Sequence, residues 1–337
     1  MGKAKLLLIS LFSLASISCV ETLISINVFP DGKYHMKIVS SGDEEDIENN
    51  DFIVPRSNQW STERKKEEND ELNQTIHVLS SEALLVGTNL LPIAYGVNTQ
   101  RYPISVKFDK GFFSDTYILH QIFEGREIDK KYPMLATALV EASSKSDEAM
   151  VQTEVIMYCL SKAMEDIGQS FRIDQLLIER MLNHFNGVFY KAEEEDRLLE
   201  IFKSKNLESA EMIRIPEALI RTNFKPFESL LPLNYVDACI DAMLPYIKEA
   251  NVTIQLNDDT FKFASTLPGS IFQSNADSVS NDTLWWAFDL KDFMNDSYTI
   301  EAASIVYYPQ RIQKAIVLGT LIILIVLFLI AKRKAIL

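Results

Sequence analysis

A charge-free apolar run close to the C-terminus constrains the fold of this chain more than any other feature of its sequence. The run extends from Ala315 to Ala331, with Lys314 before it and a K-R-K block at 332–334 directly after it. As a helix it would rise about 25 Å, and the flanking lysines can extend their ammonium groups to the lipid headgroups. We therefore predict a transmembrane helix over 315–331, followed by a short tail at 332–337.

The first residues have the layout of a secretory signal peptide at 1–18. Lys3 and Lys5 precede an apolar run, 6–17, that is too short to span a bilayer as a helix. Basic residues after a membrane helix favour a cytoplasmic position for that end. The two ends together predict a single-pass protein of the cell membrane, whose bulk is periplasmic or extracellular and whose C-terminus is cytoplasmic.

Cys19 stands at the expected cleavage site and leaves two processing routes open. Ser16 and Ser18 are small residues of the kind that an ordinary signal peptidase selects before the bond it cleaves. The same site resembles the lipobox of bacterial lipoproteins, in which the cysteine is acylated and becomes the mature N-terminus, although Ser16 stands where that group prefers leucine. Cys19 is therefore the candidate lipid-attachment residue, and the alternative is an ordinary cysteine near a new N-terminus.

Composition narrows the classes of partner. The chain has 47 acidic and 33 basic residues and a formal net charge of −14, which argues against a nucleic-acid partner. Apolar residues make up 47% of the chain, enough for a folded interior between the two ends. Cys159 and Cys239 fall on apolar faces of predicted helices, where buried free thiols are favoured and a disulfide is the alternative.

The residues after Cys19 have the two-residue period of strands. Thr22–Phe29 alternates, and Pro30-Asp31-Gly32 supplies a turn into a second strand at 34–38. The charged segments 43–51 and 62–71 are interpreted as a solvated loop and a short exposed helix. Calcium binding by 43–51 is the alternative, but the segment lacks the alternating acidic spacing that surrounds one ion with oxygens.

Strand-like alternation resumes at 104–108 and in the aromatic stretch 112–123, where Phe113, Tyr117 and Leu119 fall on one face. From 128 the period becomes helical. Asp174 is expected to precede a long helix, and Asn234 a last one. After Asn251 the period returns to two, through the residues Val252, Ile254 and Leu256.

These periods predict an α+β fold. An N-terminal β-rich part, 19–127, and a C-terminal β-rich part, 251–310, complete one antiparallel sheet, and the helices of 128–250 form a large insertion between them. The adjacent residues Trp285 and Trp286 point to opposite faces of a strand, so only one of them need belong to the core. The other is expected in hairpin packing, with a ligand cavity or an interface as alternatives.

Three parts of the sequence resemble the LppM-like group of membrane-anchored bacterial envelope proteins. They are Cys19 with the P-D-G hairpin, the aromatic strand after Lys110–Phe113, and the segment Leu267–Trp286, L-P-G-S-I-F-Q-S-N-A-D-S-V-S-N-D-T-L-W-W. The resemblance covers the β-rich parts only, because the compact members have no counterpart of 128–250. It implies a fold similar to lipid-binding α+β domains, with an apolar ligand between sheet and helix, and it supplies no catalytic residues.

No constellation for catalysis is visible in the sequence. His35, His77, His120 and His184 are far apart along the chain, and metal, nucleotide and serine-hydrolase motifs do not occur. We expect no enzyme activity, no metal and no cofactor.

Two functions follow as hypotheses. The first is an α+β domain that binds a lipid or another apolar ligand in a cavity of several hundred Å³, close to its membrane. The second is an assembly scaffold for an envelope complex, whose helical insertion presents an exposed apolar patch to a protein partner.

Overall fold

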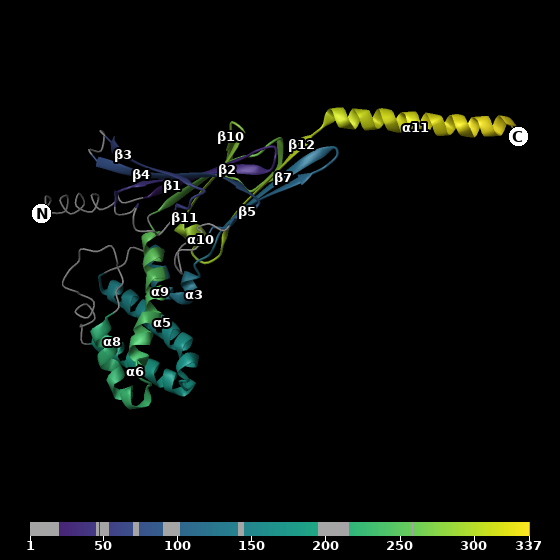
Figure 1. Cartoon of the computed structure of the whole chain (residues 1–337). Coiled ribbons are helices and arrows are strands. Elements are labelled where there is room, and N and C mark those ends of the chain that lie inside the picture. Colours follow the sequence, from purple (N-terminus) through teal and green to yellow (C-terminus); the bar gives the residue numbers. More distant parts are fainter. Residues whose placement is uncertain are drawn as a thin grey trace.

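The computed structural model describes residues 20–44, 47, 54–69, 74–89, 102–140, 145–194, 216–257 and 259–336. The predicted signal peptide, Cys19 and most of the acidic segment 43–51 lie outside these residues. Figure 1 shows most of the helices grouped apart from the sheets, so the predicted α+β class is confirmed. The β-rich parts build two sheets, however, where the sequence predicted one.

The first sheet joins both ends of the ectodomain, which is the part of the chain before α11. Its order is β10-β11-β8-β1-β2-β4-β3. Its strands are β1 (Glu21–Val28), β2 (Lys33–Gly42), β3 (Ser61–Asn69), β4 (Gln74–Val86), β8 (Thr260–Thr266), β10 (Ser278–Ser280) and β11 (Thr283–Asp289). The central pair β1 and β8 is parallel, with Ile24 opposite Phe263, because the whole helical insertion lies between these two strands in the chain.

The second sheet has the order β5-β6-β7-β12-β9. Its strands are β5 (Thr88–Asn89), β6 (Ile104–Lys110), β7 (Ser114–Phe123), β9 (Ser270–Ser274) and β12 (Tyr298–Tyr307). Its longest pairing joins β7 to β12, with Tyr117 opposite Ser304. Both sheets therefore take strands from both β-rich parts, which bears out the prediction that the two ends of the ectodomain fold together.

The predicted β1–β2 hairpin is confirmed. The amide of Phe29 donates to the carbonyl of Lys33 at 2.8 Å, and Gly32 has a φ of 82°. That left-handed conformation suits glycine, and a Cβ atom at Gly32 would lie 2.6 Å from the Cβ of Phe108. The turn therefore packs directly on β6, and Tyr117 of β7 donates to the carbonyl of Pro30 at 2.9 Å.

The helical module, residues 128–255, extends from one end of the sheets (Figure 1). It contains α3 (Ile128–Lys131), α4 (Pro133–Val140), α5 (Lys145–Phe171), α6 (Gln175–Glu194), α8 (Glu217–Phe224), the 3-10 helix η1 (Lys225–Leu230) and α9 (Tyr235–Gln255). The predicted helix after Asp174 is confirmed, and the amide of Leu176 donates to the Asp174 carboxylate at 3.2 Å. The interior face of α6 includes Met181 and Phe185, both fully buried.

Two secondary-structure assignments made from the sequence were wrong. The charged segment after Thr62 belongs to strand β3 and not to a helix. It pairs antiparallel with β4 and forms an exposed edge of the first sheet. Helix α9 continues to Gln255, so the strand expected through Val252 and Ile254 is helical. Both Val252 and Leu256 are buried, and their spacing of four residues fits one helix face.

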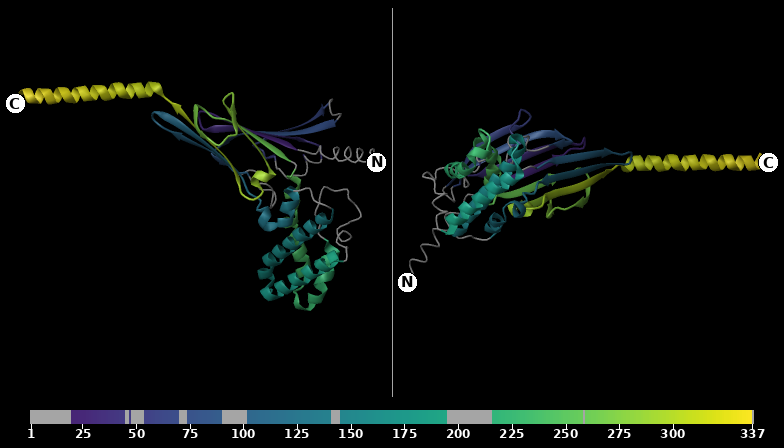
Figure 2. Two further views of the ribbon diagram at one scale, coloured as in Figure 1. Left: turned by 180° about the vertical axis from the view of Figure 1, so that it is seen from behind. Right: turned by 90° about the horizontal axis from the view of Figure 1, so that it is seen from below.

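Helix α11 (Pro309–Ile336) leads away from the end of β12. Figure 2 shows it at the end of the molecule opposite the helical module in both views. Its segment Pro309–Leu329 is long and apolar enough to cross a membrane, with none of its most apolar window buried inside the protein. The helix thus fits a single membrane crossing, as the sequence predicted.

Candidate functional site

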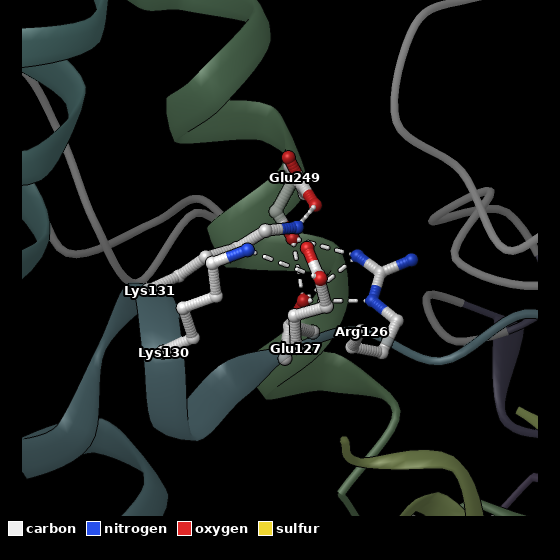
Figure 3. A network of polar contacts seen from close by, with 6 residues as sticks. Arg126, Glu127, Lys130, Lys131 and Glu249 are labelled. Atoms are coloured by element: carbon white, nitrogen blue, oxygen red, sulfur yellow. Dashed lines mark hydrogen bonds and ion pairs between the residues drawn. The ribbon is translucent and has the colours of Figure 1, made fainter. Parts of the chain in front are cut away.

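A buried polar junction connects the sheets to the helical module (Figure 3). It consists of Arg126, which follows β7, Lys131 of α3, and Glu249 and Thr253 of α9. The guanidinium of Arg126 donates to the hydroxyl of Thr253 at 2.7 and 3.1 Å and to the backbone carbonyl of Glu249 at 3.1 Å. Lys131 donates to the Glu249 carboxylate at 2.7 Å.

The backbone beside Arg126 is fixed by the last residue of α10 (Leu290–Phe293) and by the residues that follow it. The amide of Arg126 donates to the carbonyl of Phe293 at 3.0 Å, and the amide of Asp129 donates to the side chain of Asn295 at 2.9 Å. A Cβ atom at Gly125 would lie 2.4 Å from the carbonyl oxygen of Asn295, so only glycine permits this approach. The chain that leaves β7 is therefore fixed by α9 on one side and by the residues at and after the end of α10 on the other.

The electrostatics of the junction are structural in character. Arg126 is only 6% exposed, and burial lowers the pKa of its guanidinium while the nearby Glu249 carboxylate opposes that shift. A buried cation is tolerated when it is hydrogen-bonded and compensated in charge. The junction meets both conditions within the protein. We therefore interpret it as a structural connection between the sheets and the helical module, and not as a ligand-binding site.

The far end of the helical module exposes apolar side chains. We call this surface the distal tip: Leu176 at the start of α6, Leu230 at the end of η1, and Leu233 before α9. Their exposed fractions are 65%, 52% and 87%. The two turns that carry them are neighbours, because the rings of Phe171 and Tyr235, which close α5 and open α9, lie 5.4 Å apart. The assembly hypothesis expects an exposed apolar patch on the helices, and these three leucines are the residues that would form it at the distal tip.

The interior of the ectodomain is filled by large side chains. Fully buried members include Trp286, Tyr34, Tyr102, Tyr117, Phe123, Phe261 and Phe263. The residues Gln310, Gln313, Lys314, Val317, Leu318 and Leu321 outline a shallow surface hollow, but all six belong to one exposed face of α11 and none to the ectodomain. A bilayer would cover that surface, so this hollow is not the ectodomain cavity that the ligand hypothesis predicted.

The structure places the four histidines apart. His35, His77 and His120 lie 3.7, 3.8 and 3.6 Å from the carboxylates of Glu82, Glu44 and Glu301, and His184 packs on Phe185 and Phe227. Within the described ranges, no group of three or more His, Cys, Asp or Glu side chains is arranged to hold a metal ion.

The adjacent tryptophans separate as their strand positions require. Trp286 is 1% exposed, and its indole N–H donates to Asn275 at 2.9 Å, whereas Trp285 is half-buried on the opposite face of β11. Asn275 also accepts from the amide of Glu301 at 2.8 Å and so connects β11 to β12. Trp286 is therefore the core residue of the pair. Trp285 lies opposite Ala264 of β8 and Ser278 of β10.

Both described cysteines are free and buried, as favoured from the sequence. Burial raises the pKa of the Cys239 thiol to about 12, and burial followed by the nearby Glu249 raises that of Cys159. The reactive thiolate is accordingly scarce at neutral pH.

We expect neither cysteine to react with iodoacetamide at pH 8 in the native protein, because both thiols are protonated and inaccessible. In guanidinium chloride both should react within the same period. Mass spectrometry of the peptides that contain Cys159 and Cys239 measures the two conditions separately. Rapid native labelling of either peptide would contradict the burial described here.

Comparisons with known proteins identify no relative of this chain. No family model, no curated protein and no solved structure matches the chain.

Proposed function

We propose that this chain is a non-enzymatic, single-pass membrane protein whose helical module binds another protein through the distal tip. In this proposal α11 is the anchor and the two sheets are the body that carries the module away from the anchor. The observation that supports it most directly is Leu233, which is 87% exposed on a turn between two helices. Exposed apolar side chains gathered at one end of a molecule are typical of a protein interface.

The surroundings of the distal tip favour a protein partner over a lipid surface. The tip lies at the end of the molecule opposite α11, away from the proposed bilayer (Figure 2). Beside it, Arg221 of α8 forms an ion pair with Asp237 of α9 at 2.5 Å, and both side chains are exposed. An apolar centre with a charged rim is the usual composition of a protein interface. The partner we infer presents an apolar segment to this tip.

The cellular side of the ectodomain is part of the same proposal. Cleavage of a signal peptide at 1–18 and the K-R-K block after the apolar run would place the helical module in the periplasm or outside the cell, with the C-terminus in the cytoplasm. The intact mass of the denatured protein tests this, because it reports whether the mature chain starts at Cys19 and whether acyl groups are attached.

A lipid or other apolar ligand inside the ectodomain is the second candidate, in line with the resemblance to the LppM-like group. The observation that favours it is Gln121 on the inner face of β7. Its side chain is fully buried, and neither amide atom has a hydrogen-bond partner among the described residues. Such an amide is costly to bury unless a water molecule or a polar ligand group meets it.

The two candidates are separated by native mass spectrometry of the full chain, purified from its own membranes in mild detergent. We expect a second polypeptide bound to the unmodified chain, and an at least tenfold lower occupancy in the Leu233→Glu variant, because a central charge removes about 1.4 kcal/mol or more of binding free energy. The matched control is Val279→Glu on β10, a residue that is 65% exposed on the first sheet.

The control should retain the partner at the occupancy of the unmodified chain. A partner that both variants keep or both lose would contradict docking at the distal tip. An apolar adduct of a few hundred daltons without any polypeptide would replace the proposal by the ligand-binding candidate.

A further inference from the structure

We infer that the tip of the β6–β7 hairpin is a second membrane contact, which inserts into the headgroup region of the bilayer that α11 crosses. The contact consists of Phe112 and Phe113 in the turn of the hairpin and Tyr307 at the end of β12. It holds the ectodomain upright on the membrane. The inference rests on the membrane anchoring proposed above and is independent of docking at the distal tip.

Hydrogen bonds fix this hairpin to the first turn of α11. The amide of Tyr308 donates to the carbonyl of Phe113 at 2.8 Å, and the guanidinium of Arg311 donates to the carbonyl of Phe112 at 3.4 Å. The hydroxyl of Tyr308 donates to the carboxylate of Asp115, which is only 3% exposed. Arg311 also lies over the ring of Tyr308, 4.2 Å from its centroid. The hairpin tip and the helix therefore keep a fixed relation at the membrane.

The side chains of the tip are apolar and face outward. Phe112 is 68% exposed, Phe113 46% and Tyr307 60%. The two phenyl rings form an edge-to-face pair with centroids 4.9 Å apart, so they present one continuous apolar surface. Aromatic side chains at the ends of membrane helices characteristically lie at the level of the lipid headgroups.

The depth of the tip fits the same level. The charge-free run Ala315–Ala331 would rise about 25 Å as a helix, and the flanking Lys314 and Lys332 can extend to the headgroups on either side of a hydrocarbon core of about 30 Å. The charge-free run starts at Ala315, seven residues after Tyr308, so the tip lies about 10 Å outside the start of that run. Lys110 in the hairpin and Arg311 at the start of α11 would then lie at the level of the lipid headgroups, where long cationic side chains place their charge.

The upright orientation has a consequence for Cys19. The β1–β2 turn packs on Phe108 near the hairpin tip, while Val20 lies at the other end of β1, about 26 Å along the strand. An acyl group on Cys19, the neighbour of Val20, would reach the bilayer only if the strands lay along the membrane plane. An upright ectodomain and acylation of Cys19 in the same membrane therefore exclude one another.

Tryptophan fluorescence in nanodiscs tests the inference with the full chain. Phe112→Trp and Phe113→Trp place a reporter at the tip, and Thr260→Trp places one on an exposed residue at the Val20 end of β8. Each variant is measured in discs of ordinary phosphatidylcholine and in discs whose acyl chains are brominated near the headgroup. The emission of the unmodified chain, which has three tryptophans, is subtracted.

We expect the added emission at 112 or 113 to fall about twofold in the brominated discs, while the emission added at 260 stays unchanged, as interfacial aromatic residues require. Equal emission in both discs at 112 and at 113 would overturn the membrane contact. Quenching at 260 as strong as at 112 would overturn the upright orientation and support acylated Cys19.

Discussion

Replacing Phe288 by alanine is expected to lower the free energy of unfolding of the ectodomain by about 3–5 kcal/mol. Phe288 of β11 in the first sheet lies 4.5 Å, centroid to centroid, from both Phe123 of β7 and Tyr298 of β12 in the second sheet. It also stacks on Phe261 of β8 at 5.3 Å. The ring therefore closes the two sheets on one another, and its removal leaves a cavity that stiff strand backbones fill only in part.

Guanidinium unfolding of the full chain in mild detergent, followed by tryptophan fluorescence, measures this loss. The control is Phe272→Ala on β9, where the side chain is 57% exposed and the same atoms are deleted with a change of about 0.5 kcal/mol or less. Because domains of this kind are stable by about 5–15 kcal/mol, the two variants should differ clearly in their midpoints. A loss below about 1 kcal/mol for Phe288→Ala would mean that the sheets do not close through this residue.

Features determined by local sequence were predictable. Alternation in Thr22–Phe29 and the residues Pro30-Asp31-Gly32 determine a hairpin, since the turn requires the left-handed conformation that glycine adopts. The α+β class followed from the change of period. The division into two sheets did not follow, because the parallel pairing of β1 with β8 depends on residues more than two hundred positions apart.

Local sequence patterns predicted the wrong structure at an edge strand and at the end of a helix. Strand β3 is charged and exposed over Ser61–Glu67, a pattern that a solvated helix shares, and its assignment depends on pairing with β4. Val252, Ile254 and Leu256 alternate as a strand would, yet Val252 and Leu256 are also four residues apart on the inner face of α9. Three residues cannot distinguish the two periods, and tertiary packing decides.

The candidate sites were predictable to different degrees. The membrane helix α11 was predictable because its apolar run consists of consecutive residues. Phe113 was assigned to the face of Tyr117 and Leu119, but it lies in the turn before β7 and is 46% exposed while those two are buried. The junction of Arg126 with Glu249 joins residues 123 positions apart and leaves no local signal.

Replacing Glu249 by alanine is expected to cost about 3 kcal/mol of stability, since it leaves two poorly hydrated cations without their carboxylate. Lys131 and Glu249 form an ion pair at 2.7 Å with side chains only 19% and 15% exposed, and the Glu249 carboxylate is also the anion that acts on buried Arg126. Arg126 keeps its hydrogen bonds to Thr253 and to the backbone carbonyl of residue 249, but the charge of both cations is then uncompensated.

A matched pair separates the effect of burial from that of distance. Lys162 and Glu165 on α5 also lie 2.7 Å apart, but their side chains are 39% and 47% exposed, so Glu165→Ala should cost about 0.5 kcal/mol or less. In the Lys131→Met background, the loss of unfolding free energy caused by Glu249→Ala should be smaller by about 1 kcal/mol or more, because one of the two cations has been removed. The four variants are measured by the same unfolding assay. Equal costs for Glu249→Ala and Glu165→Ala would show that water hydrates the junction as freely as the surface of α5, and that its charges do not hold the helical module to the sheets.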